Sequence, residues 1–392
     1  MEDYKNFLKL SITAEEYEKR IQNVQKEIEK RNIDLGIIYC TPNKPGDLLY
    51  LTGIDPNVFD AGAIITREKL FVLGGFETHE FAMDTMKAGE YKIIEGYDVV
   101  GDWPGVKFNK IEDVLKEASP KIKKLGLLTS KDVISIGFLE KITQELSGVE
   151  VVDATDIIAN LRYIKSEMEQ NIIKASNVIN TEAMKKMIDT LSPGLRELEI
   201  ASEGDYIIKK LGARSYGFDV VVLSGKRAEA NIGRASNKII EKGDMVVLGI
   251  STRFEGYACG LGRTLVAGSA SKEQVQFLEH GIKALEMASG NVKYNQPAKF
   301  IDLAPRKYLK SVGLGDYQYY SVGHGSGIHE CLEEKGADQF SNYLLPKNII
   351  MQVDVGIFGH PSFHGARHED PFLINNKGET ERLTDLPTKV YY

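Results

Sequence analysis

The chain has 392 residues, of which 42% are hydrophobic and 27% are charged, and it carries a formal net charge of −7. This length exceeds the roughly 100–200 residues of a typical domain, so two domains are expected. The acidic balance excludes a general nucleic-acid binder, which needs a basic face. The sequence contains no apolar run of the roughly 18 residues that a membrane-spanning helix requires, so we expect no membrane partner.

Two features predict a cytoplasmic protein. Residues 1–5 are charged and lack the apolar segment of a secretory signal peptide. The three cysteines, Cys40, Cys259 and Cys331, are far apart in the sequence and form no CxxC pair. This cysteine usage is typical of a reducing compartment rather than of a disulfide framework.

Helix and strand patterns alternate over the first 155 residues. Thr13, followed three residues later by Glu16, predicts a capping box at the start of an amphipathic helix. Apolar segments predict strands at 35–39, 63–66, 69–73, 91–94, 125–128 and 149–152, with helical stretches near 110–118 and 134–146. This alternation predicts a compact α/β domain over residues 1–160.

The pattern changes after residue 160. Ser166 and Glu169 form a second capping box, which opens a long amphipathic helix that ends at residues 192–194. A further helix is expected at 195–211, with Gly212 as its C-cap. Strands are then expected at 219–223, 244–251, 257–266, 317–322, 349–356 and 367–374, with one helix near 272–289. The second domain therefore spans 161–392.

Six short segments of this second part resemble, in order, the motifs of one superfamily. They are residues 161–166, 224–225 with 233–236, 242–247, 256–257 with 263–264, 323–330 and 367–370. In order and spacing they are similar to the M24 superfamily of prolidase, aminopeptidase P, methionine aminopeptidase and creatinase. The resemblance implies a creatinase-type α/β N-terminal domain and an α+β C-terminal domain with the pita-bread fold. It also implies a homodimer.

The resemblance implies a metal site with substitutions. Members of the family hold two divalent metals on two Asp, one His and two Glu side chains. The His position matches His324, the second Glu matches Glu369, and the first Glu position holds Asp354. Both Asp positions hold glycine, Gly249 and Gly260. The stretch between His324 and the next histidine of the motif is also two residues shorter than the family has.

These glycines remove ligands that divalent metals need, because such ions prefer carboxylate oxygens. We therefore expect no dinuclear centre and no cofactor, or one divalent metal on His324, Asp354 and Glu369. Strand alternation places Gly260 and Gly262 on one face, where the small side chains reflect drift or leave space for a substrate.

The leading hypothesis is a creatinase-like hydrolase that cleaves a C–N bond in a small, cationic substrate. Asp354 and Glu369 would hold a guanidinium or ammonium group through charge-assisted hydrogen bonds. Creatinase uses a histidine as its acid and base, but the matching position here holds Ile232. Proton transfer is therefore assigned to His324 or His329.

The remaining polar candidates have supporting roles. Arg263 is predicted to pair with a carboxylate such as Glu369 and so to support substrate binding. By strand alternation, His368 and Cys259 point away from the site. Cys331 follows the last histidine motif but lacks a nucleophile signature.

Two other hypotheses remain open. One is a divergent Xaa-Pro dipeptidase or aminopeptidase with at most one metal. The other is a non-catalytic binding protein that keeps the fold. The expected partner in all three is a small molecule or short peptide, with no nucleic acid.

Overall fold

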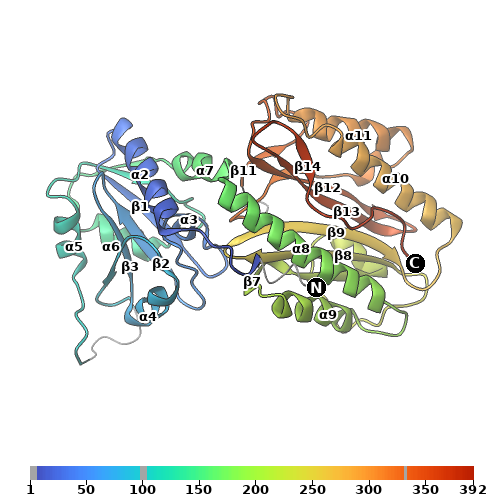
Figure 1. Ribbon diagram of the computed structural model, residues 1–392, viewed down its shortest axis with the longest axis horizontal. Helices are drawn as coiled ribbons and strands as arrows, with labels where there is room; N and C mark the ends of the chain where they lie inside the picture. Colours follow the sequence, from blue (N-terminus) through green and yellow to red (C-terminus); the bar gives the residue numbers. More distant parts are fainter. Residues whose placement is uncertain (1–6, 98–103, 331–332) are drawn as a thin grey trace. The chain divides into compact units, whose positions relative to one another are not determined.

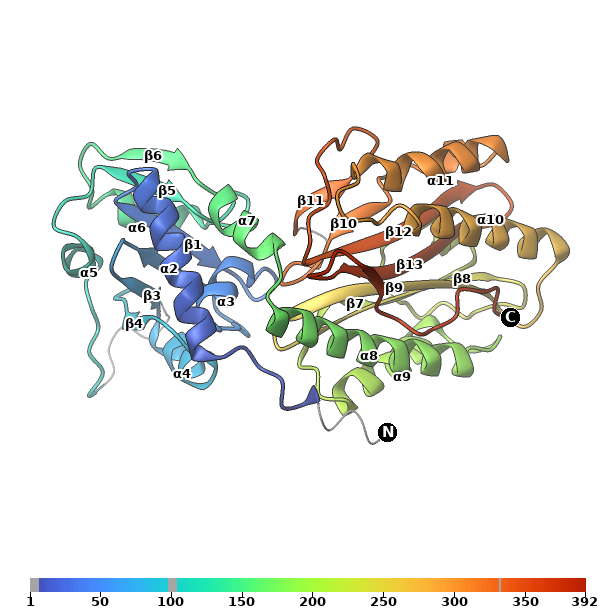
Figure 2. The same cartoon turned by 45° about the horizontal axis from the view of Figure 1, so that its top comes forward.

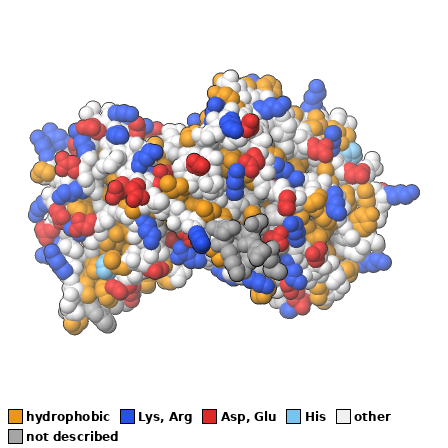
Figure 3. Space-filling model, viewed as in Figure 1, with side chains coloured by type: hydrophobic (Ala, Val, Ile, Leu, Met, Phe, Trp, Pro, Cys, Tyr) orange, Lys and Arg blue, Asp and Glu red, His pale blue; other side chains and the backbone are white. Residues whose placement is uncertain are grey.

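A computed structural model of the chain describes residues 7–97, 104–330 and 333–392. The contacts divide it into two units, one of Ile12–Arg162 and one of Tyr163–Tyr392 together with the residues that precede Ile12 (Figure 1). Within these ranges no helix is long and apolar enough to cross a membrane. On the face in Figure 3, the acidic and basic side chains are interspersed over each unit.

The N-terminal unit is an α/β domain built on one mixed sheet. Its strand order is β4-β3-β2-β1-β5-β6, with β1 antiparallel to β2 and parallel to β5. The strands are β1 (Leu35–Cys40), β2 (Ala61–Ile65), β3 (Leu70–Gly74), β4 (Glu90–Ile93), β5 (Lys124–Leu127) and β6 (Glu150–Asp153). The helices are α2 (Ala14–Lys30), α3 (Gly46–Thr52), α4 (Phe76–Thr85), α5 (Ile111–Ala118), α6 (Ile136–Thr143) and α7 (Asp156–Tyr163).

The two N-terminal helix caps that the sequence predicts, at Thr13 and Ser166, are present in the structure. Thr13 Oγ1 accepts the Glu16 N–H at 3.3 Å and caps α2. Ser166 and Glu169 form the complete capping box of α8 (Glu167–Thr190), in which Glu169 Oε2 accepts the Ser166 N–H at 2.6 Å.

The C-terminal unit is built on a single eight-stranded sheet. Its order is β11-β10-β12-β13-β9-β8-β7, and β14 pairs with β13. The strands are β7 (Ser215–Ser224), β8 (Met245–Phe254), β9 (Tyr257–Val266), β10 (Gly323–Gly325), β11 (Glu333–Ala337), β12 (Ile349–His360), β13 (His364–Ile374) and β14 (Thr380–Arg382). Its helices after α8 are α9 (Glu197–Lys210), α10 (Lys272–Ser289) and α11 (Lys299–Ser311).

The structure of this unit differs from the sequence-based expectations in three places. Helix α11 was not predicted, because Pro305 lies inside it and interrupts the helical pattern. The strand expected at 317–322 does not form, and a 3₁₀ turn at Gly315–Tyr317 precedes the short strand β10 instead. Strands β10 and β11 have three and five residues, too few to show a clear period in the sequence.

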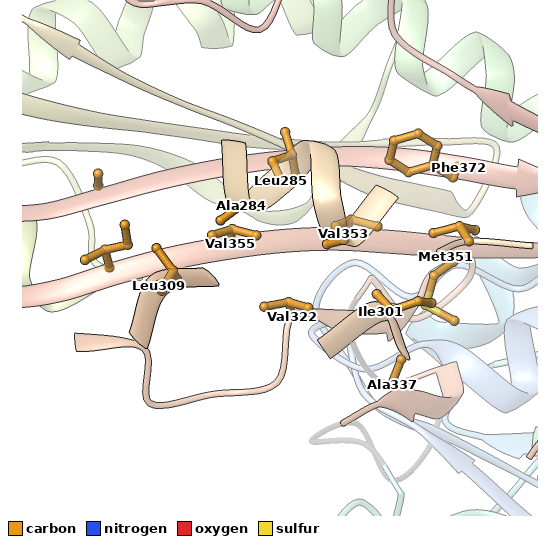
Figure 4. Packing of buried hydrophobic residues seen from close by; sticks show 14 of the residues in the cluster. Ala284, Leu285, Ile301, Leu309, Val322, Ala337, Met351, Val353, Val355 and Phe372 are labelled. Carbon is orange, nitrogen blue, oxygen red and sulfur yellow. The ribbon is translucent and has the colours of Figure 1, made fainter. Parts of the chain in front are cut away.

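The hydrophobic core fixes which face of β12 is available for function. Met351, Val353 and Val355 point toward Leu285 of α10 and Ile301 of α11 (Figure 4). Side chains alternate along a strand, so Gln352 and Asp354 lie on the opposite face.

Helix α8 lies against β8 and β9, and helix α10 lies against β12 and β13 (Figure 2). Asn177 of α8 donates a hydrogen bond to Cys259 Sγ on β9. A Cβ at Gly281 of α10 would lie 2.9 Å from His368 Cδ2 on β13. Both contacts lie on the side away from Glu369, which confirms that Cys259 and His368 point away from the site.

Candidate active site

Four strands bring the candidate residues together on the face that the helices leave open. Across β10 and β12, His324 pairs with Gln352. Across β12 and β13, Asp354 pairs with Glu369, and Glu369 in turn pairs with Gly262 of β9. The register therefore places one histidine, one amide and two carboxylates in adjacent positions.

A buried arginine forms ion pairs with both predicted carboxylates. Arg367 Nε donates to Asp354 Oδ1 at 3.0 Å, and Arg367 Nη2 lies 2.7 Å from Glu369 Oε2. Burial raises the pKa of Glu369 above its usual range, although Arg367 opposes this shift. Burial alone would lower the pKa of Arg367, but Asp354 and Glu369 outweigh it and raise that pKa. The cation that we expected from a substrate at Asp354 and Glu369 is thus supplied by the chain itself.

Gln352 is a site residue that the sequence interpretation missed. Its Nε2 donates to Glu369 Oε1 at 2.7 Å and to the Gly260 carbonyl at 2.8 Å. These bonds fix the orientation of the Glu369 carboxylate from the side opposite Arg367. Its position two residues before Asp354, on the same face of the strand, could have revealed it.

Three side chains converge in a geometry suited to a metal ion. One ligand atom from each of His324, Glu330 and Glu369 lies within 4.8 Å of the other two. His324 Nε2 is 3.8 Å from Glu369 Oε1. His324 Nδ1 donates to the Gly325 carbonyl at 3.1 Å, because a carbonyl can only accept. This tautomer leaves the Nε2 lone pair directed at the cluster, as in metal-ligating histidines.

Glu330 corrects the predicted ligand set of His324, Asp354 and Glu369. Its side chain is only 7% exposed, and its Oε1 has no hydrogen-bond partner among the described residues. Asp354 is instead engaged by Arg367 and is not part of the cluster. The shortened spacing after His324 was the available signal, but it does not reveal where the next glutamate points.

Of the two glycines that replace expected ligands, Gly260 faces this cluster and Gly249 faces Arg367. A Cβ at Gly260 would lie 2.4 Å from Glu369 Oε1 and 2.9 Å from Glu330 Oε1. A Cβ at Gly249 would lie 3.4 Å from Arg367 Nη1. The structure therefore places positions 249 and 260 where side chains would enter the site.

The other predicted site residues lie beside the cluster. His329 is half-buried in the turn after β10, and its backbone N–H donates to Glu333 Oε1 at 3.3 Å. Arg263 is fully buried, and its guanidinium bonds Asp370 Oδ1 at 2.8 Å and the backbone carbonyl of Glu369 at 3.0 Å. The expected pair with the Glu369 side chain is not formed, so Arg263 has a structural role. Cys331 lies outside the described residues.

Comparison with known proteins gives the family. Residues 171–376 match the family model described as "Metallopeptidase family M24", and residues 20–164 match "Creatinase/Prolidase N-terminal domain". The chain belongs to family M24. This M24 chain is 29% identical over 367 residues to the Xaa-Pro dipeptidase of Pyrococcus horikoshii, covering 93% of this chain and 96% of the relative. It is also 29% identical over 331 residues to the Xaa-Pro dipeptidase of Pyrococcus furiosus, covering 81% and 93%.

Solved structures agree with this placement of the M24 chain. The prolidase of Pyrococcus horikoshii has a TM-score of 0.80 at 28% identity, covering 94% of this chain and 99% of that one. The prolidase of Pyrococcus furiosus has a TM-score of 0.76 at 27% identity, covering 93% and 99%. The predicted architecture, a creatinase-type N-terminal domain and a pita-bread C-terminal domain, is confirmed.

The same comparisons correct the functional expectations. The expectation of no cofactor is wrong, because the family is one of metallopeptidases and its similar members are Xaa-Pro dipeptidases, which points to metal dependence. The hydrolase class is confirmed. Among the hypotheses, the comparisons favour the Xaa-Pro dipeptidase over the creatinase-like enzyme.

The residues present fit one divalent ion. An imidazole nitrogen and two carboxylates converge, and one buried carboxylate oxygen, Glu330 Oε1, lacks a partner in the described parts of the chain. A second ion would need carboxylates that Gly249 and Gly260 do not provide, and Asp354 is already paired with Arg367.

Proposed function

We propose that this chain is a metal-dependent dipeptidase that hydrolyses Xaa-Pro dipeptides with one divalent ion. Its match to Xaa-Pro dipeptidases extends over both domains. The observation that carries the proposal is the buried cluster of His324, Glu330 and Glu369 on the open face of an M24 sheet.

The residues of the site divide into holding and orienting groups. His324, Glu330 and Glu369 would hold the ion, which when bound supplies Lewis-acid polarisation of the scissile carbonyl. Arg367 and Gln352 hold the two oxygens of Glu369, so this carboxylate is oriented before a substrate arrives.

Proton transfer is then assigned to His329. His324 becomes a ligand rather than the acid or base that we first assigned to it. His329 is half-buried in the turn that follows β10, five residues after His324, and would protonate the leaving amine.

The test is hydrolysis by the full chain after removal and controlled return of metal. With Mn²⁺ we expect hydrolysis of Leu-Pro and Met-Pro, little hydrolysis of the matched dipeptide Leu-Ala, and loss of all activity with EDTA. Metal-loaded protein that cleaves no Xaa-Pro dipeptide would contradict the proposal and favour a binding protein. Dimerisation stays a prediction, which sedimentation of the same sample checks.

A further inference from the structure

The turn that follows β10 is attached firmly to strands β8 and β9. The Ala258 N–H donates to the Gly327 carbonyl at 2.8 Å, and Ser326 Oγ donates to the Ala258 carbonyl at 2.9 Å. Arg253 Nη1 donates to the Ile328 carbonyl at 2.6 Å. Because Ala258 lies two residues before Gly260 on β9, these bonds fix the point at which the next side chain of the turn enters the site.

That next side chain is Glu330, and two glycines give it room. A Cβ at Gly217 of β7 would lie 2.8 Å from Glu330 Cγ, and a Cβ at Gly260 would lie 2.9 Å from Glu330 Oε1. A larger residue at either position would displace the glutamate. Position 260 therefore lacks the aspartate that the family has there, and the absence of a side chain leaves space for the carboxylate of Glu330.

Glu330 Oε1 lacks a hydrogen-bond partner in the part of the chain that the structure describes. Glu330 is only 7% exposed, and its carboxyl group lies within 4.8 Å of the carboxyl group of Glu369. An unpaired buried carboxylate is costly unless a cation or a donor completes it. In the neutral tautomer that donates Nδ1–H to the Gly325 carbonyl, the third member of the cluster, His324, has its lone pair on Nε2.

The charges of the group suit one divalent ion. Asp354 and Glu369 both contact the guanidinium of Arg367, and a carboxylate oxygen of Glu330 lies within 4.8 Å of one of Glu369. With all three carboxylates ionised, as metal binding requires of its ligands, one divalent ion would bring this group to neutrality, whereas a second would leave an excess of two positive charges. Arg367 Nη1, which has no hydrogen-bond partner among the residues described, is directed toward the empty side-chain position of Gly249.

We propose that Glu330 is a metal ligand that replaces the carboxylate absent from position 260, and that it forms a single-ion centre with His324 and Glu369. This inference rests on the metal dependence proposed above but not on the identity of the substrate. Arg367 supplies the fixed positive charge on the side where a second ion would need further ligands.

The experiment is titration of the metal-free full chain with Mn²⁺ by calorimetry. Wild type is expected to bind one ion per chain, and Glu330→Gln is expected to bind more than about 100-fold more weakly, beyond the loss that outer-sphere changes cause. Glu333→Gln is the matched control. It removes the same charge at similar burial from a carboxylate that faces Lys165 at 3.8 Å, and the glutamine keeps an oxygen that can accept the His329 N–H, so it should bind within threefold of wild type. Binding by Glu330→Gln within threefold of wild type would overturn the proposal.

A rescue variant tests the replacement itself. Glu330→Ala should lose binding, and the double variant Gly260→Asp with Glu330→Ala should regain it to within about tenfold of wild type. The aspartate must displace only the ends of two flexible side chains, Glu369 and Gln352. A folded double variant that stays unable to bind would overturn the replacement, and if it does not fold, the Glu330→Gln titration decides.

Circular dichroism of each metal-free variant establishes folding before titration. Wild type that binds one Mn²⁺ through Glu330 but cleaves no Xaa-Pro dipeptide would refute the proposed function and leave this ligand assignment intact.

Discussion

Glu369 and Asp370 are neighbours on β13, but their side chains belong to two very different buried clusters. Both oxygens of Asp370 are paired, Oδ1 with Arg263 at 2.8 Å and Oδ2 with Arg382 at 2.9 Å, and Arg263 Nε is the buried atom of this pair of arginines that has no hydrogen-bond partner among the described residues. On the Glu369 side, several buried polar atoms have no hydrogen-bond partner in the described ranges, namely Glu330 Oε1, Arg367 Nη1, Gln352 Oε1 and Ser251 Oγ. Buried polar groups are normally paired, so this concentration of unpaired atoms marks a site for a ligand rather than a structural network.

Breaking the paired cluster should have the largest effect, and it should affect stability. Asp370→Asn leaves Arg263 as a buried, uncompensated cation, so we expect the free energy of unfolding to fall by about 3–5 kcal/mol. Urea denaturation measures this loss. The Mn²⁺ affinity of the folded variant should remain within threefold of wild type. A loss of affinity as large as that of Glu330→Gln would show that the two clusters are not distinct.

Breaking the unpaired cluster should instead affect chemistry. His324→Ala removes a proposed ligand, so kcat/KM for an Xaa-Pro dipeptide should fall by at least about 100-fold. The His324 side chain is 19% exposed, and the free energy of unfolding of the metal-free protein should change by less than about 1 kcal/mol. Steady-state kinetics and urea denaturation on the same preparation separate the two effects. Unchanged turnover would remove His324 from the site.

Crowding the space around Glu330 should have an intermediate effect. Gly217→Ala places a methyl group 2.3 Å from Ser251 Oγ and 2.8 Å from Glu330 Cγ, so we expect a loss of about 1–3 kcal/mol in stability and weaker Mn²⁺ binding. The control is Gly137→Ala in α6, where a Cβ meets nothing closer than 3.8 Å and the helix gains up to about 1 kcal/mol. Calorimetric titration that finds wild-type affinity in Gly217→Ala would mean that Glu330 does not need this space.

Breaking an exposed ion pair should have the smallest effect on stability. Arg31 and Asp156 lie 2.6 Å apart at 39% and 47% exposure, so Asp156→Asn should cost only about 0.2–1 kcal/mol. The hydrogen bond from Arg31 lowers the pKa of Asp156 in the folded state. The contribution of this ion pair to the free energy of unfolding is therefore present above the pKa of Asp156 in the unfolded state. It is lost as the pH falls through the lower pKa of Asp156 in the folded state. Urea denaturation at neutral and acid pH checks both points, and a loss as large as that of Asp370→Asn would contradict this ordering.

Much of the fold could be predicted because its signals are local. The capping box at Ser166, the apolar strands and the ordered family motifs all lie in short stretches of sequence. Helix α11 was not predicted because Pro305 interrupts its helical sequence pattern, and β10 and β11 were not predicted because they are short. These elements depend on tertiary packing more than on pattern.

The site was predicted only where family motifs or strand alternation determine it. The motifs gave His324, Asp354 and Glu369, and alternation turned Cys259 and His368 away from the site. It could not reveal Glu330, because the path of that turn depends on hydrogen bonds from Arg253 and Ala258, about seventy residues earlier in the chain. Nor could it show that Arg367 supplies the positive charge that we had assigned to a substrate.

The most direct test of the single-ion site is elemental analysis of the full chain after incubation with manganese, cobalt and zinc and desalting. The cluster of His324, Glu330 and Glu369 predicts about one ion per chain in wild type. Two ions per chain, or none, would contradict it.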